Sequence, residues 1–221
     1  MNTELVITED GSHTIYLPDL QVTYHSTHGS IQESNHVFIN AGLEYIAANQ
    51  NKPIRIFEMG LGTGLNALLT GKWTVENNIA VDYVAIELFP LPKLEVDALN
   101  YVSILHDVQG FFSQIHNAEW GKEVIISPLF KFLKLNTSLL NYTPTEKFNL
   151  IYFDAFAPLI QPELWTTEVF IALYNLLNNG GVLTTYCSKS DVRRSMMAAG
   201  FTVEKIPGPP GKREMVRAMK K

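Results

Sequence analysis

The sequence predicts an α/β protein built on a doubly wound, mostly parallel β-sheet. A continuous apolar run at residues 150–153 leads directly into Asp154, which is typical of a buried parallel strand. A second short apolar strand, beginning at Ile54, leads into three alternating glycines and then into a helix. Further along the chain, strand-like and helix-like segments alternate, and this alternation predicts a parallel sheet covered by helices.

The expected elements follow from periodicity and from turn residues. Turn residues at 9–12 and 17–19 divide residues 4–25 into a hairpin and a third strand, and apolar spacing predicts a helix from about Ser30 to Ala48. Two late strands joined by a Pro/Gly-rich loop predict an antiparallel edge. We therefore expect an N-terminal β extension with its leading helix over residues 1–50, and one folded core over residues 51–221. The core elements expected after Ile54 are helix 64–72, strand 81–87, a helix from Pro92, helix 109–118, strands 130–135 and 148–154, helix 162–178, strand 182–187, helix 189–199, and strands 201–206 and 213–218.

Composition narrows the class of protein. The 221 residues carry a formal net charge of −5, which argues against a protein that coats nucleic acid indiscriminately. Residues 189–221 nevertheless hold nine Lys/Arg against three Asp/Glu; both local phosphate contacts and a solvated basic face are open interpretations. No apolar run approaches membrane-spanning length and no signal sequence is visible, so we expect a cytoplasmic protein without membrane contact. Cys187, the one cysteine, is expected to pack in a strand.

The glycine-rich segment predicts a ligand-binding loop. Gly60, Gly62 and Gly64 permit positive φ and a close approach of the backbone to a ligand above a helix N-terminus. The spacing is not that of the dinucleotide fingerprint, in which two residues separate the second glycine of the motif from its third, whereas only Thr63 separates Gly62 from Gly64. The following strand ends at Glu87, where a doubly wound fold places a carboxylate for ribose hydroxyls.

Asp154 is the candidate for chemistry. Ligands of open α/β sheets bind outside the carboxyl ends of the strands, and Asp154 ends such a strand, with Phe156 and Pro158 as an apolar wall. The alternative is a turn residue or the N-cap of the next helix. His25 and His28 fall in a polar loop without the Cys or acid cluster that a metal site needs, so no metal is expected.

The segment from Glu58 to Asn66 resembles the first motif of class I S-adenosylmethionine methyltransferases, whose fold is Rossmann-like. Asp-Ala-Phe-Ala-Pro at 154–158, followed by Gln-Pro-Glu-Leu-Trp-Thr at 161–166, is similar to a stretch of the tRNA 5-methylaminomethyl-2-thiouridine methyltransferases, the methyltransferase half of the MnmC type and its stand-alone MnmD form. Further matching segments, in the same order as in that family, are residues 24–38, 62–66, 87–91, 199–203 and 212–215.

This resemblance implies transfer of a methyl group from S-adenosylmethionine to the aminomethyl nitrogen of 5-aminomethyl-2-thiouridine at the tRNA wobble position, giving 5-methylaminomethyl-2-thiouridine. Asp154 would accept the amine proton or orient the nitrogen, and Phe156 would pack on an extruded base. The expected partner is a tRNA anticodon stem-loop. The implied cofactor-binding residues are Glu58, Gly60, Gly62, Gly64, Asn66, Glu87, Asn136 and Thr137; the implied substrate-binding residues are Tyr24, His25, Ser26, His28, Phe156, Pro158, Lys212 and Arg213.

The chain departs from the family pattern in two places. Ala155 replaces the usual Gly, and Asn136-Thr137 replaces a Gly-Asp pair whose acid often receives the adenine amino group. Asn136 and a backbone carbonyl are the alternatives for that contact. Because the chain ends at Lys221, no FAD-dependent oxidase is expected in it, and a separate oxidase or aminomethyl-installing complex is a possible partner.

Two other functions fit part of the pattern. A methyltransferase or aminopropyltransferase of polyamine-like amines shares the glycine loop and the strand-end acid, but it needs a second acid that the residues after Asp154 do not offer. A non-catalytic nucleotide-binding module would bind the cofactor without turnover.

Overall fold

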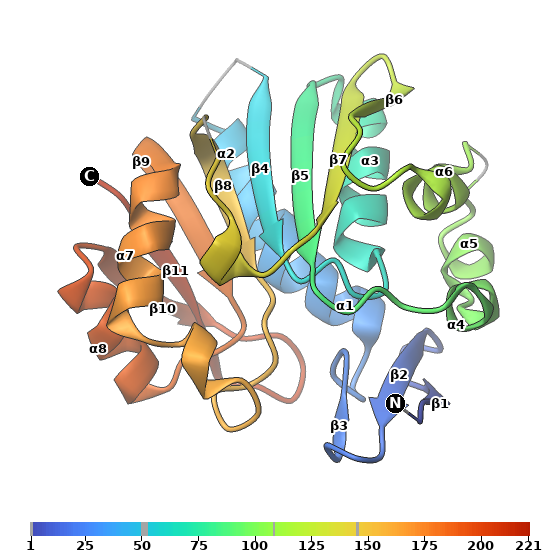
Figure 1. Ribbon diagram of the computed structural model, residues 1–221, viewed down its shortest axis with the longest axis horizontal. Helices are drawn as coiled ribbons and strands as arrows, with labels where there is room; N and C mark the ends of the chain where they lie inside the picture. The colour runs from blue at the N-terminus through green and yellow to red at the C-terminus, as the bar shows by residue number, and fades with distance from the viewer. Residues whose placement is uncertain (1, 50–52, 108, 145) are drawn as a thin grey trace.

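A computed structural model describes residues 2–49, 53–107, 109–144 and 146–221. The expected boundary at residues 50–51 lies outside the described residues. Eight strands form the central sheet in the order β10-β11-β9-β8-β4-β5-β7-β6 (Figure 1). The five strands from β9 to β7 are parallel, whereas β6, and β11 against both its neighbours, pair antiparallel. The strands are β4 (Ile54–Met59), β5 (Val81–Glu87), β6 (Val124–Ser127), β7 (Phe130–Asn136), β8 (Phe148–Phe153), β9 (Leu177–Thr185), β10 (Thr202–Pro207) and β11 (Glu214–Met219).

Helices cover both faces of this sheet. Successive strand residues point to opposite faces, so Ile56 packs into one apolar cluster and Phe57 into the other. The first cluster includes Leu68 of α3 (Leu65–Asn77), and the second includes Phe170 of α7 (Thr167–Leu176). The sheet is therefore doubly wound, as expected. The other helices are α1 (Ser30–Ser34), α2 (Tyr45–Ala47), α4 (Lys93–Ala98), α5 (Tyr101–Ile104), α6 (Phe111–Asn117) and α8 (Ser190–Ala198), with 3₁₀ turns at Leu139–Asn141 and Pro162–Leu164.

The structure differs from the expected elements in four local details. The helix expected over 30–48 is wound as a π-helix over Asn35–Glu44, between α1 and α2. The helix expected over 162–178 starts instead at Thr167, because the Thr166 side chain accepts a hydrogen bond from the Val169 amide and caps it there. Strand β9 begins at Leu177 rather than 182 and ends before Cys187, which is buried just beyond it. Strand β6 was not anticipated, since it is a four-residue edge strand with Ile125 exposed.

The N-terminal extension forms a separate antiparallel sheet of β1 (Glu4–Ile7), β2 (His13–Leu17) and β3 (Val22–Thr23). Figure 1 shows it beyond the carboxyl ends of the central strands, at the lower right of that view. It is fastened to the segment around α5, because the His13 amide donates to Asn100 Oδ1 (2.8 Å) and the Tyr101 hydroxyl to the His13 carbonyl (2.7 Å). The extension therefore lies over the sheet edge at which ligands bind in such folds.

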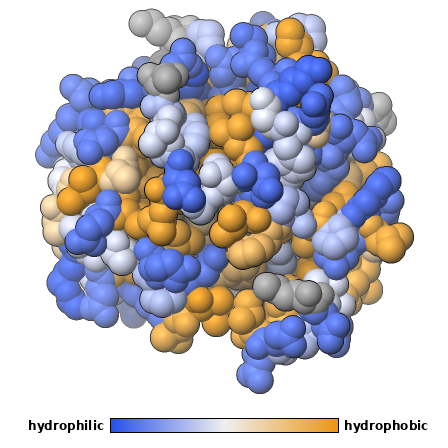
Figure 2. All heavy atoms as spheres, in the orientation of Figure 1, coloured by the Kyte–Doolittle hydropathy of each residue, from blue (hydrophilic) through white to orange (hydrophobic). Residues whose placement is uncertain are grey.

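The surface is mixed in polarity. On the face shown in Figure 2, apolar side chains gather in patches across the middle and lower parts of the molecule, and hydrophilic ones occupy much of its outline. Within the described residues, none of the helices is both long and apolar enough to cross a membrane.

Candidate functional site

Three strand ends meet at one cavity of about 630 Å³, a size suited to a small-molecule ligand. The glycine loop follows β4, Glu87 ends β5, and Asp154 follows β8. The strands that follow β4 in the chain lie first on one side of it (β5, β7) and then on the other (β8, β9). Doubly wound sheets bind ligands at such a topological switch point. Leu17, Leu20 and Val22 of the N-terminal sheet complete the opposite wall.

The glycine loop is shaped by close backbone contacts. Gly60 and Gly62 have φ values of 90° and 49°, which L side chains rarely adopt. A Cβ at Gly60 would lie 2.7 Å from the Asp154 carbonyl oxygen, and one at Gly62 would lie 3.1 Å from the Tyr24 ring. The amides of Gly60 and Leu61 both donate to the Ile86 carbonyl at 3.1 Å, so the loop is held against the end of β5.

Glu87 is directed at this loop. One of its carboxylate oxygens accepts the Gly62 amide (3.0 Å) and the other accepts the Phe89 amide (2.8 Å). Burial raises the pKa of Glu87, and these two amides act in the opposite direction. A carboxylate has about four lone-pair positions, so two bonds leave capacity for hydroxyls of a ligand.

Asn66 connects two acids at the other end of the cavity. Its Nδ2 donates to Asp154 Oδ2 and to Glu58 Oε1, both at 3.0 Å. Desolvation, together with the charge of Glu33, raises the pKa of Asp154 to about 7, while Asn66 and Lys212 oppose the rise. Glu58 is fully buried and its pKa lies well above the usual range, mainly through desolvation. Asn66 therefore links an acid whose pKa is raised by burial to one that titrates near neutral pH.

An ion pair lies beside Asp154. Lys212, from the loop between β10 and β11, places its Nζ 2.5 Å from Glu33 Oε1 of α1. The other Glu33 oxygen accepts the Ser26 amide at 2.7 Å. Lys212 Nζ also lies 4.0 Å from the centre of the Tyr186 ring, whose hydroxyl donates to the Ala155 carbonyl (2.8 Å). Lys212, Glu33, Ser26 and Tyr186 all line the cavity.

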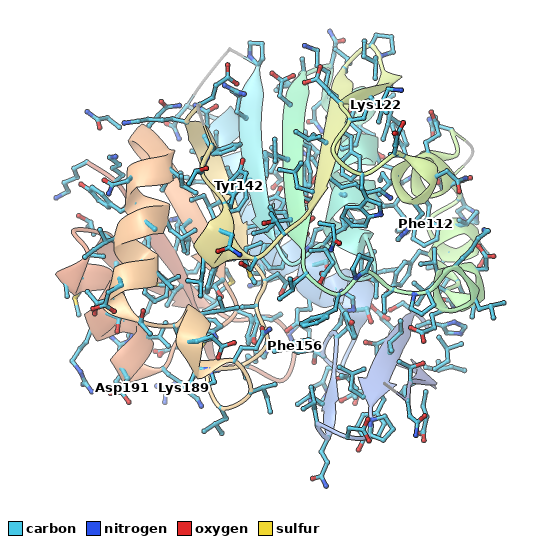
Figure 3. All side chains as sticks on the ribbon, in the orientation of Figure 1. Phe112, Lys122, Tyr142, Phe156, Lys189 and Asp191 are labelled. Atoms are coloured by element: carbon cyan, nitrogen blue, oxygen red, sulfur yellow. The ribbon has the colours of Figure 1, made fainter. Side chains whose placement is uncertain are left out.

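Aromatic side chains form the wall near the opening. The rings of Tyr24 and Phe156 meet edge to face with centres 5.2 Å apart. Figure 3 places Phe156 between the carboxyl edge of the sheet and the N-terminal sheet. His25 is buried between Thr14 and Thr63, and desolvation lowers its pKa to about 4, so it is neutral at physiological pH.

The structure brings together most, but not all, of the residues proposed from the sequence. Thr137 lines the cavity, whereas Asn136 is exposed and donates to the carbonyls of Glu87 and Leu88. Glu58 lies behind Asn66. Gly64 caps α3 beneath His116, whose neutral ring lies 3.0 Å from the Thr63 carbonyl. Glu58, Gly64 and Asn136 therefore do not line the cavity, and neither do His28, which is paired with Glu9, Pro158 and the exposed Arg213.

Sequence reasoning assigned no role to Glu33, Tyr186, His116 or Ser138. Glu33 belongs to the 24–38 segment that carries the family resemblance, and an acid on the core-facing side of a predicted helix is the one signal that marks it. No group of three or more His, Cys, Asp or Glu side chains able to hold a metal occurs among the described residues.

The doubly wound sheet, the glycine loop and the strand-end acids define an α/β fold with a ligand-sized cavity at its topological switch point. The chain belongs to the family described as S-adenosyl-L-methionine-dependent methyltransferase, whose profile matches residues 110–221, just over half of the chain. It is therefore a methyltransferase enzyme.

Curated relatives extend the match over most of the chain. The bifunctional protein MnmC of Leptospira borgpetersenii, named for tRNA 5-methylaminomethyl-2-thiouridine biosynthesis, is 31% identical over 87% of this chain and 31% of its own length. The protein of the same name from Cupriavidus metallidurans is 31% identical over 97% of this chain and 33% of its own length. The chain thus spans about a third of the length of these relatives.

Solved structures support the fold. MNMC2 from Aquifex aeolicus aligns over the whole chain and 71% of its own, with a TM-score of 0.75 and 24% identity. Spermidine synthase from Thermotoga maritima aligns over 99% of this chain and 71% of its own, with a TM-score of 0.51 and 13% identity.

The cavity fits the cofactor of this family. Glycines at 60 and 62 let the loop pack closely against the Asp154 backbone and the Tyr24 ring, and both present bare backbone to the cavity that they line. Glu87 retains acceptor capacity for ribose hydroxyls, and Thr137 lies on the adjoining wall. Asn66 keeps its Oδ1 buried without a hydrogen-bond partner among the described residues, which leaves an acceptor at the other end of the site.

Proposed function

We propose that this enzyme transfers a methyl group from S-adenosylmethionine to the aminomethyl nitrogen of 5-aminomethyl-2-thiouridine at the wobble position of tRNA. The related MnmC proteins, which are named for tRNA 5-methylaminomethyl-2-thiouridine biosynthesis, support the substrate class. The observation that carries the proposal is the placement of Asp154, a carboxylate with a pKa of about 7, in the wall of the cofactor-sized cavity. A general base is most effective when its pKa lies near the working pH.

The chemistry divides between cofactor and protein. S-adenosylmethionine supplies an electrophilic methyl group on a sulfonium. A primary amine is mostly protonated near pH 7, so its nitrogen needs to lose a proton before its lone pair can attack. Asp154 accepts that proton, and Asn66 holds the carboxylate in one orientation. The new bond joins nitrogen to the methyl carbon, and the bond from that carbon to sulfur breaks.

Once the acceptor base is extruded from its stack in the RNA, it needs an apolar protein surface to pack on. Phe156 and Tyr24 offer such a surface at the cavity wall. We propose the anticodon stem-loop as the partner, with Ser26 and His25 in the same wall and the exposed Arg213 available to phosphates. A contact between Lys212 and a tRNA phosphate stays a prediction, because the Lys212 ammonium is paired with Glu33.

The chemical context of the reaction also belongs to this proposal. The only cofactor proposed is S-adenosylmethionine, without FAD or metal. The acceptor amine would come from a separate oxidase or from an aminomethyl-installing complex, and the enzyme would act in the cytoplasm, where tRNA is modified.

A polyamine-like amine is the second candidate acceptor. Such a substrate needs a second acid; residues 155–158, directly after Asp154, do not provide one, but the fold brings Glu33 and Glu163 into the same cavity. This observation keeps the candidate in the test.

The test is a methylation assay with S-adenosylmethionine carrying a labelled methyl group. The acceptors are tRNA bearing 5-aminomethyl-2-thiouridine, spermidine and putrescine, with a reaction lacking acceptor as blank. We expect label in tRNA. Label in polyamine alone, or in neither, overturns the proposal. Asp154→Asn should reduce the rate at least about a hundredfold, in line with the loss of a general base, while calorimetry finds cofactor binding retained.

A further inference from the structure

Two charged groups from distant parts of the chain line the same cavity as Asp154. Glu33 lies in α1 and Lys212 in the loop between β10 and β11, 179 residues apart, and they meet as an ion pair in the cavity wall. The Glu33 side chain is only 9% exposed, and both of its oxygens are engaged, by Lys212 and by the Ser26 amide. Burying a carboxylate is costly unless it is paired and hydrogen-bonded, so these contacts hold Glu33 in one place.

Lys212 is equally constrained. Its ammonium lies between the Glu33 carboxylate and the face of Tyr186, which is fixed in turn by its hydrogen bond to the Ala155 carbonyl. Ala155 directly follows Asp154. The ion pair is therefore tied to the loop that carries the proposed base.

The charges act on Asp154 in opposite directions. The anion at Glu33 raises the pKa of Asp154, and the cation at Lys212 lowers it. The other groups facing Asp154 are Asn66, which donates to it, Glu58, Tyr83 and Tyr186. Ionised Asp154, Glu33 and Lys212 together carry a net negative charge, which complements an ammonium.

We propose that the charges of the Glu33–Lys212 ion pair act on Asp154 and set its readiness to accept a proton. The ion pair and Asp154 together would suit the acceptor side of the cavity to an amine that arrives as an ammonium ion. This inference rests on the proposed function for the identity of the acceptor. The effect on Asp154 itself is independent of any acceptor.

Two single substitutions test the inference because they break the same ion pair but remove opposite charges. In Glu33→Gln the acid limb of the pH–rate profile should move to lower pH, and in Lys212→Met to higher pH, each by about one unit. If the pair only braced the fold, both variants would change in the same direction. Lys205→Met is the matched control, since it breaks an exposed ion pair with Glu214 on the same hairpin, at 2.8 Å.

A second measurement needs no acceptor. Carbon-13 NMR of labelled aspartate side chains, with the Asp154 signal assigned from its loss in Asp154→Asn, reports the titration of Asp154 directly. We expect opposite displacements of its midpoint in Glu33→Gln and Lys212→Met, and none in Lys205→Met. Equal, parallel or absent displacements overturn the inference. If the wild-type enzyme methylates no tRNA, the proposed function fails, and this titration still decides the role of the ion pair.

Discussion

Replacing Asn66 by Leu should raise the pH at which the enzyme becomes active. Leu has nearly the shape of Asn but donates no hydrogen bond, so Asp154 loses the amide contact at 3.0 Å that favours its ionised form. A hydrogen bond to a charged group contributes about 1.5–3 kcal/mol, equivalent to about one to two pKa units. The pKa of Asp154 should therefore rise from about 7 to about 8 or 9.

This shift sets the size of the effect on rate. At pH 7 about half of Asp154 is ionised in the wild type, and a rise of about one unit leaves roughly a tenth ionised. The initial rate of methyl transfer should fall about fivefold at pH 7 and recover at pH 9. The assay is the rate at saturating cofactor and low tRNA concentration, measured from pH 6 to pH 9.5.

The control uses the same substitution on the same helix. Asn77 lies at the end of α3, where its Nδ2 donates to the Trp73 carbonyl at 3.0 Å, away from Asp154. Asn77→Leu should leave the acid limb of the profile unchanged. If the profile of Asn66→Leu coincides with that of the wild type, or if its rate is low and flat across the range, Asn66 does not act through the charge of Asp154.

Two further predictions concern stability. The pKa of Asp154 is raised from 3.8 to about 7 on folding, so the wild type loses stability as pH rises through this interval; Asp154→Asn should be more stable above pH 7, by at most about 4 kcal/mol, with no difference below pH 4. Urea unfolding at pH 4 and pH 8.5 measures this, and an equal difference at both values contradicts it. Gly11→Ala places a side chain at a φ of 82° with no atom within 4 Å, so it should lower the free energy of unfolding by roughly 1–2 kcal/mol. Gly60→Ala combines an unfavourable φ with a clash against the Asp154 carbonyl, so it should lower the free energy of unfolding by more. Calorimetry should also find cofactor binding weakened only in Gly60→Ala; equal effects of the two substitutions would refute the steric reasoning.

The parts of the site that follow a strand could be predicted from the sequence. The glycine loop, Glu87 and Asp154 all come directly after an apolar run, and parallel strands bring their carboxyl ends to one edge. That rule needs no knowledge of distant contacts. It also yields the order of elements in the core, because each β-α unit is signalled locally by its own periodicity.

The parts that depend on distant contacts could not be predicted. Glu33 and Lys212 carry no local sign that they meet, since their pairing follows from how α1 and the last hairpin pack around the sheet. In the sequence, Lys212 and Arg213 look like two neighbouring surface cations. In the structure, only Arg213 is exposed. The π-helix over 35–44 could not be predicted either. Its hydrogen bonds span five residues instead of the four of an α-helix, so the spacing of apolar residues differs by only about one position per turn.

The two sides of the cavity differ in how freely evolution or design can alter them. The Asp154 amide donates a hydrogen bond to the Met59 carbonyl, and a Cβ at Gly60 would collide with the Asp154 carbonyl. The cofactor loop and the proposed base therefore form one unit that tolerates little change. Leu17, Leu20 and Ser26, by contrast, come from segments near the N-terminus of the chain. Substitutions that retarget this enzyme to another amine therefore belong in those segments, where they would leave the machinery of methyl donation intact.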